Sequence, residues 1–155
     1  MSKYSSKAIS TWHQLLQCYK SMERNIGGQL QNKHSQSLSR FDVLSQLCQA
    51  SEDWLQVGEL TRRLLDTAGS VSALLTRMEK EGLIERRLNP DDRRSFQVTV
   101  TAKGRSLHKE MASDYAKWVA SAMEDISDQE REVLMGLLNR LSRAQKGSAT
   151  GEISG

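Results

Sequence analysis

The sequence predicts a mainly α-helical protein with one small β-hairpin between two groups of helices. Over most of the chain, apolar residues recur at spacings of three and four, which is the period of a helix with one buried face. Between Ile84 and Val100 the period changes to two, as in a pair of half-buried strands. The only proline of the sequence, Pro90, lies between the two halves of this segment in a turn-forming sequence. A hairpin flanked by helices follows from these observations.

The length and composition of the chain exclude several classes of protein. At 155 residues we expect one structural domain with its own core, and two distant cysteines do not make a disulfide framework. The sequence has no apolar run of membrane-spanning length and begins without the apolar segment of a signal peptide, so we expect a cytoplasmic protein with no membrane partner. It lacks a phosphate loop, the common hydrolase motifs and any metal-binding histidine spacing, so we expect no enzyme, cofactor or metal site.

Residues 5–32 are expected to form a long first helix with a long apolar stripe. The stripe has seven large side chains at helical spacing: Ile9, Trp12, Leu16, Tyr19, Met22, Ile26 and Leu30. A small domain does not cover so long a stripe from within, so we expect a second copy of the chain to cover it. A second helix is expected to start at Ser39, with Asp42 completing the capping pattern. Its expected buried residues are Phe41, Leu44, Leu47 and Cys48.

Residues 57–82 have the pattern of two helices joined by a tight turn. The first helix has Val57, Leu60 and Leu64 on its buried side, and Asp66 with Thr67 ends it. We expect Thr67 to cap the second helix and Gly82 to end that helix. The buried side of the second helix follows an i, i+3, i+4, i+7 pattern made of Val71, Leu74, Leu75 and Met78.

The opposite face of this second helix carries short, hydroxyl-bearing or cationic side chains. They are Ser70, Ser72, Ala73, Thr76 and Arg77. Small residues allow a close approach to DNA, hydroxyls reach phosphates, and an arginine can pair bidentately with guanine. We therefore expect this face to bind in the major groove of double-stranded DNA, the alternative being an ordinary solvated helix face.

The turn of the hairpin carries two adjacent arginines, Arg93 and Arg94. An exposed arginine at a hairpin tip can enter a narrow minor groove, where the negative potential is deepest, and Asp92 can hold Arg94 extended. Residues 56–105 hold ten Lys or Arg against seven Asp or Glu, whereas the remainder has twelve of each, so the net charge lies in this segment. Helix, turn, helix and charged hairpin together make a winged helix-turn-helix by pattern.

Two more helices are expected after the hairpin. Thr101 can cap a long helix over residues 102–124, and Ser127 with Glu130 forms the capping box of the last helix. The expected inward residues of the long helix are Leu107, Met111, Tyr115, Trp118, Val119 and Ala122. The last helix carries Val133, Leu134, Leu137, Leu138 and Leu141. Residues 147–155 have almost nothing to bury, and we expect a disordered tail.

Three motifs around the hairpin resemble the MarR family of bacterial transcription regulators. They are Glu79-Lys80-Glu81-Gly82-Leu83-Ile84-Glu85-Arg86-Arg87, Asp92-Arg93-Arg94 and Val98-Thr99-Val100-Thr101-Ala102-Lys103-Gly104. They match the acidic helix end and Gly-Leu-Val/Ile of the family, its wing Asp-x-Arg, and the Leu-Thr-x-x-Gly that closes its second wing strand. Val100 stands where the family usually has Leu. Ala73 stands where it often has Arg or Asn, so the base contact of the family does not carry over there.

The resemblance, extended by helix lengths to residues 5–146, implies a homodimeric transcription regulator, more often a repressor than an activator, on a pseudo-palindromic operator. Asp92 and Arg94 would be its wing pair, and residues 51–56 would supply a short third strand. A small aromatic or anionic effector would bind between the dimer base and the DNA-binding lobe, with Trp12 and Tyr19 as candidate ligand-binding residues. The expected parts of the one domain are a dimerisation helix (1–38), a DNA-binding lobe (39–101), dimerisation helices (102–146) and the tail (147–155).

Two alternatives stay open. Winged helices also serve as protein-interaction modules that do not touch DNA, but such a module has no need of the Asp92-Arg93-Arg94 tip. Cys18 resembles the first-helix thiol of peroxide-sensing members of the family, which would make the protein a redox-sensing regulator. A reactive thiolate needs a lowered pKa and some exposure, and the sequence shows neither. Trp12, which resembles the first-helix tryptophan of urate-responsive members, also suits ordinary packing at a dimer interface.

Overall fold

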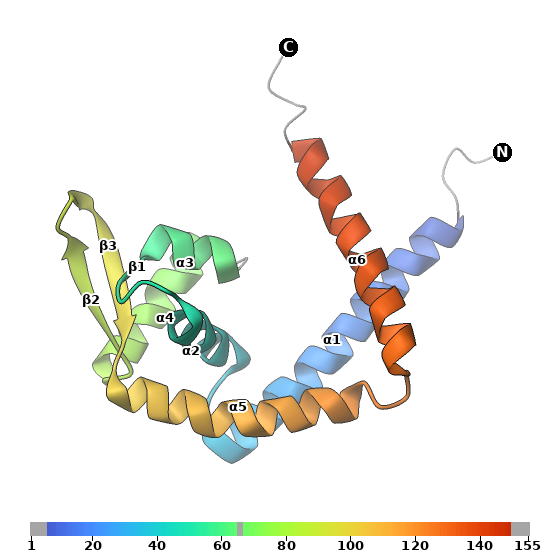
Figure 1. Cartoon of the computed structure of the whole chain (residues 1–155), viewed down its shortest axis with the longest axis horizontal. Coiled ribbons are helices and arrows are strands. Elements are labelled where there is room, and N and C mark those ends of the chain that lie inside the picture. Colours follow the sequence, from blue (N-terminus) through green and yellow to red (C-terminus); the bar gives the residue numbers. More distant parts are fainter. Residues whose placement is uncertain (1–5, 65–66, 150–155) are drawn as a thin grey trace, which may run out of the picture. The chain divides into compact units, whose positions relative to one another are not determined.

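The computed structural model describes residues 6–64 and 67–149 of the chain, and these residues confirm the predicted fold class (Figure 1). The elements in chain order are α1 (Ser6–His34), α2 (Leu38–Gln49), β1 (Leu55–Gln56), α3 (Val57–Leu64), α4 (Ala68–Lys80), β2 (Ile84–Asn89), β3 (Asp92–Val100), α5 (Ala102–Ala122) and α6 (Asp128–Ala149). The chain divides into two compact units, residues 1–118 and 119–155, and the division falls within α5. No helix in the described ranges combines the length and apolar character that a membrane crossing needs.

The core of the first unit lies where α2, α3 and α4 meet the small sheet. The four residues predicted on the buried side of α4 are all buried, and Leu60 of α3 is fully buried beside them. Val43 of α2, absent from the predicted core, is also fully buried. Met111 joins this core from α5, and Leu30 joins it from the C-terminal part of α1. The helix-turn-helix therefore has a well-packed interior that holds the outer face of α4 in place.

Both ends of α4 have the caps that the sequence predicts. The Thr67 hydroxyl accepts a hydrogen bond from the Ser70 N–H at 3.3 Å, whereas Asp66 lies outside the described residues. After the last turn, Gly82 has φ +74°, and its N–H donates to the Glu79 carbonyl at 3.0 Å. The Leu83 N–H donates to the Met78 carbonyl, also at 3.0 Å. This pair of bonds is a Schellman motif, which satisfies carbonyls at the helix end and turns the chain into the hairpin.

The start of α5 packs directly on the turn that follows α4. The Thr101 hydroxyl donates to the Gly82 carbonyl at 2.6 Å and accepts from the Gly104 N–H at 3.0 Å, so Thr101 caps α5 as predicted. A Cβ atom at Gly104 would lie 2.2 Å from the Leu83 carbonyl oxygen. Only glycine allows this approach, which gives a physical reason for the Thr-x-x-Gly spacing after β3.

The sheet has the order β1-β3-β2 with antiparallel neighbours, so residues 55–56 supply the third strand. Its hairpin turns more tightly than the sequence suggested, because Asn89 pairs with Asp92 and only two residues connect the strands. Arg93 and Arg94 therefore lie at the start of β3, beside the turn. The cross-strand pair Leu88 and Phe96 continues the alternation on the side of the buried Ile84 and Val98, but each is 51% exposed. The hairpin extends past the core that would have covered them.

Other boundaries shift by a few residues. Ser37, with extended backbone angles, is the N-cap of α2, and Ser39 lies inside that helix. Helix α5 ends two residues before the expected position, and Ala122 is exposed there. The capping box of α6 is present, since the Ser127 N–H donates to Glu130 Oε2 at 2.7 Å and the Glu130 N–H to Ser127 Oγ at 3.2 Å. Helix α6 continues to Ala149, three residues into the expected tail.

Large apolar side chains stay exposed in two helices of this single chain. On α1 only the C-terminal part of the predicted stripe is buried, at Ile26 and Leu30. The exposed large apolar residues of α1 are Ile9, Trp12, Leu15 and Tyr19. Those of α6 are Val133, Leu134, Met135, Leu137, Leu138 and Leu141. Both stripes thus have the exposure that the sequence led us to expect of a chain without its second copy.

Candidate nucleic-acid interface

The outward face of α4 is fixed by the burial of its opposite face. Ser70, Ser72, Ala73 and Arg77 are exposed along this helix, and Thr76 is half-buried among them. Ser70 lies in the first turn, where its Oγ accepts a hydrogen bond from the Thr67 hydroxyl at 3.0 Å. The Ser70 proton is thereby left to donate to another acceptor. The five residues that the sequence predicted for DNA contact therefore share one side of one rigid helix.

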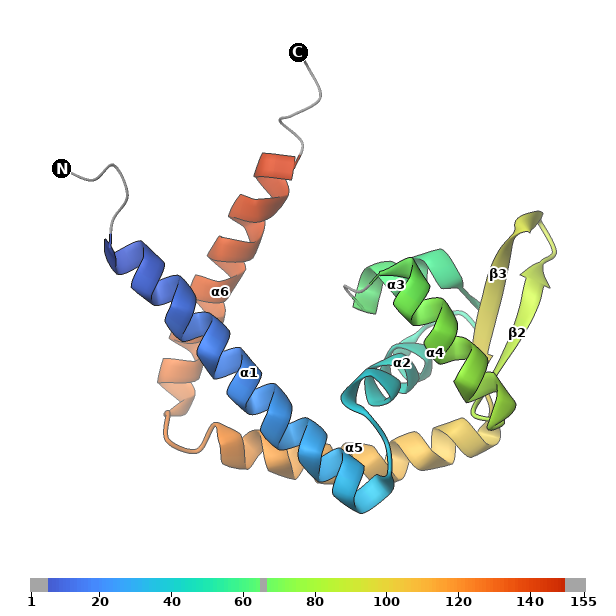
Figure 2. The same ribbon diagram turned by 180° about the vertical axis from the view of Figure 1, so that it is seen from behind.

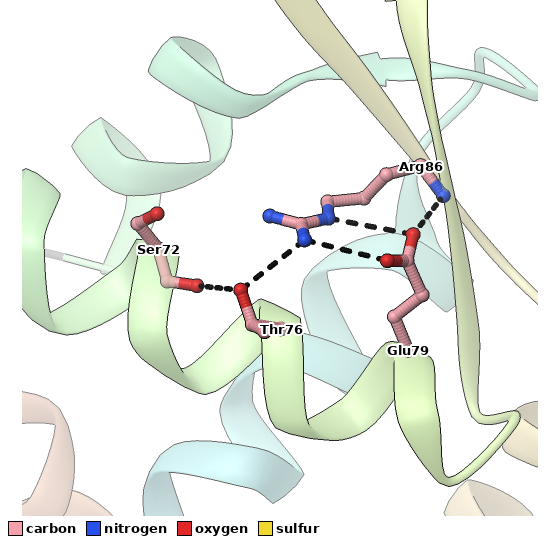
Figure 3. Close-up of polar contacts among 4 residues, drawn as sticks. All are labelled: Ser72, Thr76, Glu79 and Arg86. Carbon is pink, nitrogen blue, oxygen red and sulfur yellow. Dashed lines mark hydrogen bonds and ion pairs between the residues drawn. The ribbon is translucent and has the colours of Figure 1, made fainter.

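The Thr76 hydroxyl is already engaged within the protein. It donates to the Ser72 carbonyl at 3.0 Å and accepts from Arg86 Nη2 at 3.2 Å (Figure 3). A hydroxyl has one proton, and phosphate oxygens only accept hydrogen bonds. In this arrangement Thr76 has no proton for a phosphate, although a lone pair remains to accept from a base amino group. The geometry thus excludes donation from Thr76 to a phosphate and leaves it only as an acceptor from a base.

Arg86 is the residue of this face that the sequence reasoning missed. It lies on β2 between Ile84 and Leu88, and its guanidinium contacts Glu79 and Thr76 on α4 (Figure 3). The period of two in β2 places residue 86 on the inward side of the hairpin. A charged residue on an inward side requires a partner, and this signal was available in the sequence.

The wing residues lie beside the tight turn of the hairpin. Asp92 Oδ1 accepts from the Arg94 N–H at 3.0 Å and from Arg94 Nε at 3.3 Å. The Arg94 side chain is nevertheless 93% exposed, and Arg93 next to it is also exposed. Asp92 therefore orients a guanidinium whose remaining donors point to solvent. Helix α4 packs against β2, so the wing and the outward face of α4 belong to one lobe (Figure 2).

A second arginine of β2 lies on the other face of the hairpin. The guanidinium carbon of Arg87 lies 4.1 Å from the ring centroid of Trp54, and Arg87 Nε donates to Gln97 Oε1 at 2.9 Å. These contacts hold the Arg87 side chain beside Trp54 and Gln97. Consecutive arginines of one strand thus have different surroundings: Arg86 is bonded to α4, whereas Arg87 is stacked on the outer side.

The candidate effector and redox residues lie apart from this face. Trp12 and Tyr19 are exposed on α1, and the Tyr19 hydroxyl donates to Glu23 at 3.3 Å. The negative charge of Glu23 raises the pKa of Tyr19, so its hydroxyl stays protonated at neutral pH. Cys18 is exposed, and its Sγ lies 4.0 Å from the uncharged Sδ of Met22. Burial raises the pKa of Cys48, only partly offset by the charge of Arg105, so Cys48 is not primed as a thiolate.

Comparisons with known proteins agree with this architecture. Residues 37–95 match the family model described as MarR family. The chain is 25% identical to the transcriptional repressor YetL of Bacillus subtilis over 68% of this chain and 63% of YetL. It is 24% identical to the transcriptional regulator MhqR of the same species over 88% of this chain and 92% of MhqR. The Streptomyces coelicolor MarR family regulator Sco3205, solved in complex with DNA, superposes with a TM-score of 0.84 at 19% identity, over 93% of this chain and 91% of Sco3205. The resemblance seen in the sequence is confirmed: residues 37–95 match the MarR family model, and the described residues have the winged helix-turn-helix fold of MarR family structures.

Proposed function

We propose that this protein is a transcription regulator that binds double-stranded DNA sequence-specifically as a homodimer. The observation that carries the proposal is the pairing, in one lobe, of an exposed small, hydroxyl-bearing and cationic face on α4 with an oriented, solvent-exposed arginine on the wing. These are the two features that a major groove and an adjacent minor groove recognise. The DNA complex of Sco3205 supports the proposal, because that protein shares this fold.

In this proposal the predicted residues other than Thr76 divide the DNA contacts between them. Arg77 pairs with a guanine, and Ala73 lies against a thymine methyl group, since its side chain forms no hydrogen bond. Ser70 and Ser72 donate to phosphates or base edges. On the wing, Arg94 enters the minor groove in the orientation set by Asp92, and Arg93 neutralises a phosphate. Two lobes on one pseudo-palindromic site double these contacts.

The homodimer is proposed from the exposed apolar side chains of α1 and α6. Contiguous apolar surface of this kind on a water-soluble chain marks an interaction site, and a second copy covers it with its own matching surface. Arrangement in pairs also suits DNA, because the two α4 helices then reach successive major grooves. We expect such a dimer to act in the cytoplasm.

The proposal also includes repression of transcription and its relief by a small effector. The relative YetL is a repressor, and a dimer seated on an operator blocks access to the same DNA. A small aromatic or anionic effector would release the operator by binding more tightly to a dimer whose α4 spacing does not fit it. Trp12 and Tyr19, which are exposed on α1, offer aromatic surface for such a ligand.

The experiment is a binding-site selection from fragments of the source genome, followed by comparison of the native protein with Arg77→Ala at one salt concentration. We expect a pseudo-palindromic motif for the native protein. Arg77→Ala should relax the preference at one symmetric pair of positions, since loss of a bidentate pair costs about 1–3 kcal/mol of discrimination. Lys109→Ala, which removes a cation from an exposed position of α5, is the matched control and should leave the motif unchanged. Failure of the native protein to retain any duplex DNA contradicts the proposal.

A further inference from the structure

Arg86 makes four hydrogen bonds that join β2 to α4. Its backbone N–H donates to Glu79 Oε2 at 3.1 Å, and its Nε donates to the same oxygen at 3.4 Å. Its Nη2 donates to Glu79 Oε1 at 3.3 Å and to the Thr76 hydroxyl at 3.2 Å (Figure 3). Both carboxylate oxygens of Glu79 are thus bonded to a single residue of the wing strand. The forked geometry of the guanidinium makes this link directional as well as attractive.

Arg86 lies at the point along the hairpin where the buried part ends and the exposed part begins. Nearer the core, the inward pair Ile84 and Val100 is buried, and Val98 opposite Arg86 is fully buried. One step nearer the tip, the inward pair Leu88 and Phe96 is half exposed. Arg86 is therefore the last inward-facing residue of β2 that fastens the hairpin to the helix. The part that carries Arg94 extends beyond this point.

We infer that Glu79 and Arg86 are positioning residues that hold the wing at a fixed angle to α4, so that both reach DNA together. The inference rests on the proposed DNA-binding function and adds to it a residue pair that touches neither groove. Once α4 is seated, a stiff link raises the effective concentration of Arg94 at the minor groove. It also reduces the conformational entropy that the wing loses on binding.

We expect the same pair to contribute little to folding stability. The side chains of Arg86 and Glu79 are 25% and 39% exposed, and ion pairs in contact with solvent are weak. Weakening the link should therefore change DNA binding more than unfolding. Arg86→Lys keeps the charge but loses the fork, so it changes the geometry of the link without changing the number of cations near DNA.

The test is a double-mutant cycle between two residues that do not touch, Arg86 and Arg94. Arg94→Ala is measured in the native protein and in Arg86→Lys, on the selected operator at fixed salt. In the native protein we expect Arg94→Ala to weaken binding about tenfold. In Arg86→Lys we expect the loss to shrink to about threefold, because a loosely held wing contributes less to begin with. Arg86→Lys alone should weaken binding, since the wing that carries Arg94 is then less firmly held.

Arg87→Lys is the matched control, because it makes the same change one residue along, on the face stacked against Trp54. The tenfold loss on Arg94→Ala should persist in that background. Glu79→Gln is a second way to weaken the link and should shrink the loss as Arg86→Lys does. Thermal unfolding of each variant shows that the lobe is folded.

The outcomes separate this inference from the proposal on which it rests. Equal losses on Arg94→Ala in the native, Arg86→Lys and Glu79→Gln backgrounds overturn the inference while leaving DNA binding intact. If the native protein binds no duplex DNA, the proposed function fails, and the inference fails with it.

Discussion

The winged helix-turn-helix and helix α6 have the same kind of apolar periodicity, but their apolar residues differ in burial. In the helix-turn-helix, Leu60, Leu75 and Met78 are fully removed from solvent by neighbouring elements of the same chain. In α6, none of the described residues is buried, and Leu137 and Leu141 are both about half exposed. Spacing at three and four predicts which face of a helix is apolar, but it does not say whose surface covers that face. For α6 we propose that the cover is a second copy of the chain.

The largest expected effect is the loss of the dimer on changing α6. Leu137→Lys with Leu141→Lys places two charges on its exposed apolar stripe, and burial of unpaired charge at an interface is strongly unfavourable. We expect a folded monomer by sedimentation velocity, with operator binding lost. Asn139→Lys with Gln145→Lys adds the same charge at polar positions of α6 and should leave the dimer intact. A double variant of the leucines that still sediments as a dimer contradicts the proposed interface.

A second prediction compares one leucine from each region in that monomeric variant. Leu75→Ala empties a fully buried site and should lower the free energy of unfolding by about 2–5 kcal/mol. Leu134→Ala removes the same atoms from an exposed side chain of α6 and should cost less than about 1 kcal/mol. Urea unfolding followed by circular dichroism measures both. Similar costs at the two positions would show that α6 is covered within its own chain.

In the same monomeric variant, alanine substitutions at two glycines should change the free energy of unfolding by smaller amounts and in opposite directions. A Cβ at Gly104 would lie 2.2 Å from the Leu83 carbonyl oxygen and 2.8 Å from Val100 Cγ2, so Gly104→Ala should destabilise by about 1–3 kcal/mol. At Gly136 of α6, an added Cβ would meet no described atom within 4 Å apart from the adjoining backbone of the helix, and Gly136→Ala should stabilise by about 1 kcal/mol through helix propensity. Thermal unfolding of the two variants distinguishes the cases. A stabilising Gly104→Ala would contradict the close approach of α5 to the turn after α4.

The smallest expected effect concerns the pH dependence of the first unit. His108 of α5 stacks on Phe41 with ring centroids 5.4 Å apart, and its Nε2 lies 3.0 Å from Ser45 Oγ on α2. Burial lowers the pKa of His108 below its ordinary value of about 6.5. As pH falls through this range, the unfolded chain takes up the proton first, so the native state loses stability. In His108→Gln, urea unfolding at pH 7.5 and 5.5 should differ less than in the native protein. An equal difference would show that His108 is not the group responsible.

The caps and the buried face of α4 could be predicted from the sequence because local chemistry decides them. Thr67, Gly82 and the capping box at Ser127 act within one turn of the chain, and the four buried residues of α4 follow its period. For α2 the predicted start at Ser39 was two residues late, because the extended backbone angles place the N-cap at Ser37.

The features that could not be predicted depend on distances between elements. Alternation puts Leu88 and Phe96 on the same side of the hairpin as the buried Ile84 and Val98, but it does not show how far along the hairpin the core extends. The site residues on α4 and the wing could be listed from residue type and spacing. That Arg86 donates a hydrogen bond to the Thr76 hydroxyl follows only from the packing of β2 against α4.

The central claim is that α4 and the wing bind duplex DNA, and the salt dependence of binding in Arg94→Ala tests it most directly. Each phosphate neutralised by the protein contributes about −0.9 to the slope of log K against log salt concentration. Arg94 is 93% exposed and oriented by Asp92, so its removal should flatten the slope by about one unit per subunit. Asp92→Ala should show a weaker effect, since Asp92 only orients Arg94. Arg24→Ala, which removes an exposed cation from α1, should leave the slope unchanged. Identical slopes for the native protein and Arg94→Ala would show that the wing does not touch DNA.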